Sequence, residues 1–178
     1  LWLAHTPTRD ITPLRNLTQM KFLLLGHCKV ESIEPLRAMT ELSVLRLGGT
    51  RSITTLEPLA NLTKLIELEI SEVGASDIRA LGNLSQCGQL NLSTMPVNDI
   101  TPLAKMVSLW SVNLEQLDEI DVGPLGDLAN LHMLSIIDTD VVAGLTQLAG
   151  GPVERLTLCN ASVQSLDWVK TENTAIIS

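Results

Sequence analysis

The chain has 178 residues and a formal net charge of −8, and 45% of its residues are hydrophobic. The acidic balance argues against nucleic acid or an anionic membrane surface as the main partner, because both attract basic patches. No apolar run approaches the ~20 residues of a membrane-spanning helix, so we expect no membrane insertion within this segment. Cys28, Cys87 and Cys159 are odd in number and form no CxxC pair, which argues against a disulfide framework.

A tight L-x-L pair and a Pro-Leu dipeptide alternate along the chain. The L-x-L pairs, in chain order, are Leu23/Leu25, Leu45/Leu47, Leu68/Ile70, Leu90/Leu92, Val112/Leu114, Leu134/Ile136 and Leu156/Leu158. The dipeptides are Pro13-Leu14, Pro35-Leu36, Pro58-Leu59, Pro102-Leu103 and Pro124-Leu125, with Ala80-Leu81 in the remaining place. Both signals return with a period of about 22 residues, which is typical of stacked repeats.

Each repeat is predicted to contain one short parallel strand, one turn and one short return. An L-x-L pair points two side chains inward and sends the middle residue to the opposite face, as strand pleating requires. Proline at the start of the return occupies a position where a helix needs no N–H donor. Thr12 and Thr101, just before two of these prolines, are the expected N-caps. With about ten residues per return, a single turn of 3₁₀ or α-helix is expected.

The two ends of the chain fall inside repeats. Leu1 and Leu3 match the L-x-L pair of a preceding unit, so the chain opens in mid-strand. Val163, Leu166 and Val169 begin a last unit, and its expected strand contains Ala175, Ile176 and Ile177. We therefore expect residues 1–178 to form one α/β solenoid of about seven to eight repeats, open at both ends and part of a longer protein.

Two stretches carry a family resemblance. "LRNLTQMKFLLLGHCKVESI" and "LAKMVSLWSVNLEQLDEIDV" resemble the 22-residue class of leucine-rich repeats found in bacterial internalins and in phosphatase-regulator repeat proteins. The resemblance implies an arc with a parallel β-sheet on its concave face and short helical or 3₁₀ returns on its convex face. It also implies that the concave face binds another macromolecule, usually a protein.

One position departs from the family pattern. Where the family usually has Asn in the turn after the strand, this chain has Cys28, Thr50, Val73, Met95, Leu117, Thr139 and Ala161. Apolar side chains cannot hydrogen-bond the turn backbone. The backbone groups of the middle turns must then be satisfied by each other or by water, and we expect a less regular arc there.

Catalytic chemistry is not expected. His27 and Cys159, a possible base and nucleophile, belong to strands six steps apart, which separates them by roughly 29 Å at ~4.8 Å per strand. Gly48 and Gly49 lack the lysine and helix of a phosphate loop. We expect neither a metal site nor a cofactor, and the chain is not predicted to be an enzyme.

Function is therefore expected on the concave face, whose residues follow from the pleat. The first strands present an apolar patch, the middle presents carboxylates at Glu67, Glu69 and Glu72, and a polar zone follows. Arg46 is expected to form a weak exposed bridge with Glu69. The candidate partner-binding residues are Trp2, Phe22, Leu24, Val44, Arg46, Glu67, Glu69, Glu72, Gln89, Asn91, Asn113 and Glu115.

Three hypotheses follow from this surface. In the first, the chain is a recognition module for a protein partner, anchored by the apolar patch. In the second, the patch packs on another domain of the same chain, and the solenoid is the sensing or autoinhibitory arm of a signalling NTPase. In the third and least favoured, it is a bacterial surface adhesin. The cytoplasm is slightly favoured over the cell surface.

Overall fold

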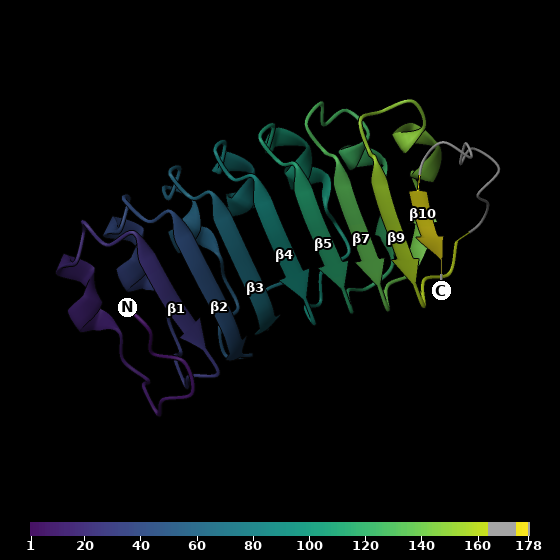
Figure 1. Cartoon of the computed structure of the whole chain (residues 1–178). Coiled ribbons are helices and arrows are strands. Elements are labelled where there is room, and N and C mark those ends of the chain that lie inside the picture. The colour runs from purple at the N-terminus through teal and green to yellow at the C-terminus, as the bar shows by residue number, and fades with distance from the viewer. Residues whose placement is uncertain (164–173, 178) are drawn as a thin grey trace.

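The computed structural model, which describes residues 1–163 and 174–177, is a solenoid built on one parallel sheet (Figure 1). The sheet has eight strands in the order β1-β2-β3-β4-β5-β7-β9-β10. Their bounds are β1 Phe22–Gly26, β2 Val44–Thr50, β3 Glu67–Val73, β4 Gln89–Ser93, β5 Ser111–Glu115, β7 Met133–Ile137, β9 Arg155–Cys159 and β10 Thr174–Ile177. The seven strands of the L-x-L pairs and the final strand are present, and the predicted α/β repeat solenoid is confirmed. The strand predicted at Leu1 and Leu3 is reduced to an isolated bridge between Trp2 and Leu24.

The returns are single 3₁₀ turns, as their length predicts. They are η1 Thr12–Asn16, η2 Glu34–Ala38, η3 Glu57–Leu59, η4 Arg79–Asn83, η5 Thr101–Lys105, η6 Gly123–Leu125 and η7 Leu145–Leu148. A small second sheet joins β6 (Ile120–Asp121) to β8 (Val141–Ala143) in the irregularly spaced part of the chain. In Figure 1 the strands line one side of the solenoid and the 3₁₀ turns lie behind them.

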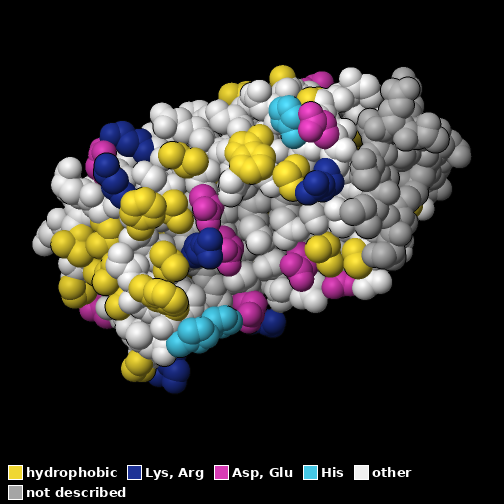
Figure 2. Space-filling model, viewed as in Figure 1, with side chains coloured by type: hydrophobic (Ala, Val, Ile, Leu, Met, Phe, Trp, Pro, Cys, Tyr) yellow, Lys and Arg dark blue, Asp and Glu magenta, His cyan; other side chains and the backbone are white. Residues whose placement is uncertain are grey.

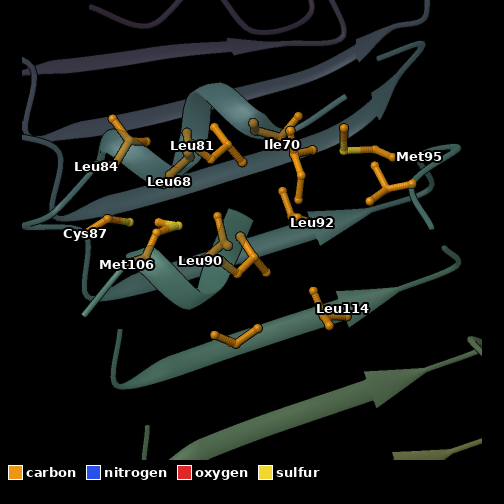
Figure 3. Close-up of a cluster of buried hydrophobic side chains, with 14 of the residues drawn as sticks. Leu68, Ile70, Leu81, Leu84, Cys87, Leu90, Leu92, Met95, Met106 and Leu114 are labelled. Carbon is orange, nitrogen blue, oxygen red and sulfur yellow. The ribbon is translucent and has the colours of Figure 1, made fainter. Parts of the chain in front are cut away.

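The core is an aliphatic ladder between the sheet and the returns. Ile70, Leu92 and Leu114 pair in register on β3, β4 and β5, and all three side chains are fully buried. Figure 3 shows these inward side chains meeting residues of the returns such as Leu81 and Met106. The strand positions between them point the other way, so the period-2 pattern decides which residues meet the solvent.

A left-handed residue lies near the C-terminal end of β2 and β3, directly follows the other strands of the regular repeats, and comes shortly after the bridge at Trp2. The residues with positive φ at this position are His5, His27, Gly49, Glu72, Thr94, Gln116, Asp138 and Asn160. Their N–H groups extend the ladder beyond the strand: that of His27 donates to the Gly48 carbonyl at 2.8 Å, and that of Gln116 donates to the Ile137 carbonyl at 2.9 Å. The turn backbone is thus satisfied by neighbouring turns, as expected. The same αL residue recurs in every one of these turns. The expectation of a less regular arc in the middle stays a prediction.

The predicted N-caps are wrong. Thr12 and Thr101 are the first residues of η1 and η5, and Ile11 and Ile100 hold the N-cap positions. Neither return has a side-chain cap hydrogen bond at its N-cap. Instead Asp10 Oδ1 accepts from the backbone N–H of Thr12 at 2.7 Å, and Asp99 Oδ1 accepts from that of Thr101 at 2.9 Å. A side chain two residues earlier therefore satisfies the first free N–H of the return. The same arrangement recurs at Ser32, Thr55, Asp77 and Asp121.

The last predicted repeat is partly described. β10 lies where the sequence places its final strand and pairs with β9, with Ala175 opposite Leu156. Val163 forms an isolated parallel bridge with Val141. Leu166 and Val169 lie outside the described residues. No helix within residues 1–163 and 174–177 is long and apolar enough to traverse a bilayer.

Candidate protein-binding surface

The outward side chains of β1, β2, β3, β4, β5, β7 and β9 form one surface, which we call the sheet face and which corresponds to the predicted concave face. Strand pairing sets its columns. Phe22, Val44, Glu67 and Gln89 are neighbours in the first column. The second column, which starts at Trp2, contains Leu24, Arg46, Glu69, Asn91 and Asn113. Glu115 follows Ser93 in the third column. These are the columns that the sequence predicts.

An apolar patch lies at the N-terminal end of the sheet face. Trp2 bridges to Leu24, and Phe22 pairs with Val44. The side chains of Trp2 and Phe22 are 72% and 57% exposed, while Leu24 and Val44 are half-buried. Figure 2 shows hydrophobic side chains gathered over this end of the sheet. We call these four residues the N-terminal patch.

An ion-pair cluster adjoins this patch on β2 and β3. Arg46 Nη2 and Nε donate to Glu67 Oε1 at 2.8 and 3.1 Å, and Arg46 Nε lies 3.4 Å from Glu69 Oε2. The predicted bridge to Glu69 is present, but Glu67 is the closer partner. The hydrogen bond to Glu67 and the charge of Glu69 raise the pKa of Arg46. Because the Arg46 side chain is 49% exposed, solvent screens these attractions, and the cluster fixes geometry more than it adds stability.

A neutral polar zone follows on β4 and β5. Asn113 Nδ2 donates to Asn91 Oδ1 at 3.2 Å, so the two amides form a short ladder across the strands. Gln89 is exposed and Glu115 half-buried. Glu72 lies near the end of β3, past Ser71 of the third column, and has a left-handed φ of 52°. The predicted residues are thus divided among an apolar end, an ionic middle and a polar zone.

Two exposed apolar residues escaped the sequence prediction. Ile66 and Trp110 lie one residue before β3 and β5, where they are 55% and 40% exposed. Gly88 separates them: the Gly88 N–H donates to the Ile66 carbonyl, and the Trp110 N–H donates to the Gly88 carbonyl, both at 2.9 Å. A Cβ on Gly88 would lie 2.8 Å from Cδ1 of Trp110, so the glycine leaves room for the indole. A tryptophan facing a glycine one repeat earlier is the sequence signal that would have revealed this pair.

Catalytic geometry is not observed in the part of the chain that the structure describes. His27 follows β1 and Cys159 ends β9, and β2, β3, β4, β5 and β7 lie between them. No group of three or more His, Cys, Asp or Glu residues in this part could hold a metal ion. Burial raises the pKa of Cys87 to about 12, so its thiol is not activated as a nucleophile.

A groove on the return side carries balanced charge. It lies between η1 and η2, and arginines and carboxylates both line it. Arg9 lies 3.4 Å from Glu31, and Arg37 lies 2.6 Å from Glu34. The groove is lined by three arginines and three carboxylates, so its charges balance and it does not favour an anion or a cation.

Comparison with protein-family models and with curated proteins finds no match. Solved structures do match. An internalin (inlF) from Listeria monocytogenes superposes with a TM-score of 0.89 and 26% identity, over 99% of this chain and 52% of that chain. Internalin C2 (inlC2) from the same species has a TM-score of 0.78 and 27% identity, over 90% of this chain and 69% of that chain. The fold is therefore a leucine-rich repeat solenoid of the internalin-like class, and the chain spans about half the length of the first internalin.

A plant peptide hormone receptor, RGFR1 in complex with RGF2, has a TM-score of 0.69 and 19% identity, over 83% of this chain and 26% of that chain. At that identity the likeness concerns the fold alone. The two internalins support an interaction module in general.

Proposed function

We propose that the chain is a non-catalytic recognition module that binds a protein partner on its sheet face. The observation that carries this proposal is the N-terminal patch, in which Trp2 and Phe22 are mostly exposed on neighbouring repeats. Soluble proteins rarely leave a contiguous apolar patch exposed without use. Aromatic side chains are also enriched among the few residues that supply most of the energy of a protein interface.

The ion-pair cluster suggests the charge of the partner. Arg46 is shared by Glu67 and Glu69, so the three residues together carry one net negative charge. With a net charge of −8 over the whole chain, a basic or mixed-charge protein surface is the complementary one. Such charges steer association and select among partners more than they add affinity. We therefore expect the apolar patch to dominate affinity and the cluster to dominate specificity.

Two alternatives use the same patch. In one it packs on another domain of the same protein, as in a leucine-rich arm of a signalling NTPase; in the other the chain belongs to a surface adhesin. The fold does not distinguish them from a separate recognition module. A crosslinking experiment on the intact protein distinguishes them. If a further domain covers the patch, a photoreactive group at Phe22 is shielded from a second protein.

The test begins with a photoreactive amino acid at position 22 of the intact protein, expressed in its own cells. The same amino acid at position 107 is the matched control, because Val107 is 59% exposed but lies in the turn after η5, away from the sheet face. We expect a partner protein to be crosslinked from position 22 and not from position 107. A crosslink from position 107 alone would contradict the proposal.

Affinity for the crosslinked protein then ranks the residues. Phe22→Ala should weaken binding about 30-fold or more, the effect of losing roughly 2 kcal/mol at an aromatic anchor. Glu69→Lys should weaken binding less, and its effect should shrink as salt is added. Val107→Ala should change nothing. If Phe22→Ala and Glu69→Lys both bind like the parent while changes on the return side abolish binding, the sheet face is not the binding surface.

A further inference from the structure

Two histidines meet at the turns beside β1. His5 and His27 occupy equivalent αL positions of successive repeats, with φ of 60° and 51°. Their rings stack with centroids 4.8 Å apart and planes 18° from parallel. The backbone holds both residues in place, because the N–H groups of His5 and His27 donate to the carbonyls of Gly26 and Gly48 at 2.8 Å. The repeat thus fixes the backbone positions from which the two rings project.

The ring nitrogens of this pair are not engaged by the protein. Within residues 1–163 and 174–177, neither ring takes part in a hydrogen bond, and both residues are exposed. His132 differs, because its Nδ1 lies 2.5 Å from the carbonyl oxygen of Asn130. The next residue of the column is Gly49, where a Cβ would lie 2.7 Å from Nδ1 of His27. The absence of a side chain there keeps space open beside the His27 ring.

We propose that His5 and His27 form a bidentate site for a divalent transition-metal ion of the zinc type. With a metal–nitrogen bond of about 2.05 Å and a ring nitrogen about 1.1 Å from the ring centre, two imidazoles on one ion at roughly 90° to 109° have centroids about 4.5 to 5.1 Å apart. The observed separation of 4.8 Å lies inside this interval. The exposed rings need only turn about their Cβ–Cγ bonds, from stacked to convergent.

The donor atoms select the class of ion. Neutral imidazole nitrogens suit Zn²⁺, Ni²⁺ and Cu²⁺, whereas Ca²⁺ and Mg²⁺ require oxygen ligands. Cys28, next to His27, does not supply a third ligand, because its buried thiol donates to the Leu3 carbonyl at 2.8 Å. Two protein ligands leave coordination positions for water or for a side chain of another molecule. The affinity is accordingly micromolar and below that of a structural zinc site.

This site could not be seen in the sequence as a metal motif. Metal motifs are recognised by ligands a few residues apart, whereas these two histidines are brought together by stacking of the repeats. The inference does not rest on the proposed function. In Figure 2 the histidine side chains at the N-terminal end lie close to the hydrophobic side chains there, so a bound ion would place positive charge near the N-terminal patch.

Calorimetric titration with Zn²⁺, repeated with Ni²⁺, tests the site on the purified chain. His5→Asn and His27→Asn remove one ligand each, and Asn tolerates the αL backbone, so the fold should survive. His132→Asn is the matched control, since His132 is the third histidine of the chain. We expect one ion per chain, a loss of at least about tenfold in affinity for either His5→Asn or His27→Asn, and no change for His132→Asn.

Four results would overturn the proposal. One is a parent chain that binds Zn²⁺ and Ni²⁺ only at millimolar concentration. Another is equal weakening by His132→Asn, which would indicate independent single-histidine binding. The third is unchanged affinity in both His5→Asn and His27→Asn. The fourth is competition by Ca²⁺ for the site as effective as that by Zn²⁺ or Ni²⁺, which would contradict a site made of nitrogen donors. Thermal melts of all three variants without metal verify that each is folded.

Discussion

Replacing Leu92 by alanine should destabilise the solenoid far more than replacing its neighbour Asn91. Leu92 is 0% exposed and lies between Ile70 and Leu114 in the strand register. A buried Leu→Ala change costs about 2.7 to 5.0 kcal/mol, more where the surroundings cannot collapse into the cavity. Ile70 and Leu114 are held by their own strands, so we expect about 3 to 5 kcal/mol. Asn91→Ala removes one partly buried hydrogen bond, worth about 1 kcal/mol.

Urea and thermal unfolding, followed by circular dichroism, measure both variants. For a domain of this size each kcal/mol shifts the melting temperature by about 2 to 4 °C. Leu92→Ala should therefore melt roughly 6 to 20 °C below the parent, and Asn91→Ala less than about 4 °C below it. Similar melting temperatures for the two variants would refute the alternation of inward and outward residues on β4.

An aspartate at the same two positions adds a test by pH. At position 92 burial raises the folded-state pKa of the new carboxyl above its unfolded value of about 3.9. The folded chain then binds more protons than the unfolded chain between these two values. Leu92→Asp should therefore be least destabilising below the unfolded pKa, and its stability should fall as the pH rises through the folded pKa. Asn91→Asp should show no such loss.

The remaining predictions concern buried polar groups and caps. Thr50→Val should stabilise the chain by about 1 kcal/mol in urea unfolding, because the buried Thr50 hydroxyl has no partner, whereas Thr139→Val should destabilise it, because Thr139 Oγ1 both donates and accepts. Asp99→Ala should cost about 0.5 to 1 kcal/mol at neutral pH. Hydrogen bonds from Thr101 lower the pKa of Asp99, so this cost is present above the ordinary carboxyl pKa and should vanish as the pH falls. Cys87 should resist iodoacetamide at pH 8 until the chain unfolds, because burial raises the pKa of its thiol to about 12.

The fold follows from the sequence because pleating and period leave little freedom. Once Leu90 and Leu92 point inward, Asn91 must point outward, and the repeat places it beside Asn113. The caps show where such reasoning stops. Asp99 and Thr101 are both good capping residues, and residue type does not choose between them. The structure shows Thr101 donating its N–H and its hydroxyl to Asp99. Thr101 is the first residue of η5, and Ile100 holds the N-cap position.

The columns of the sheet face were also predictable, whereas the contacts within them were not. Arg46 is long enough to reach Glu67 diagonally as well as Glu69 directly, and only the side-chain conformation decides that it contacts both. The indole of Trp110 lies against Gly88 for a similar reason: the empty space at the glycine is a property of two repeats together. Pairs of this kind join residues about one repeat apart, so they become visible only when successive repeats are aligned and not in a local pattern.

The exposed aromatic at position 22 is not explained by folding. The same column holds Gln89 on β4 and Ser111 on β5. Both strands pair in the same register as β1, and their inward residues are equally buried. A strand of this solenoid therefore needs no large apolar side chain at that position. Phe22 leaves 57% of its surface in water, so its burial contributes only part of what a buried aromatic would contribute. The property that distinguishes Phe22 from Gln89 and Ser111 is the area it offers to another surface, which is why it is the first residue to test for binding.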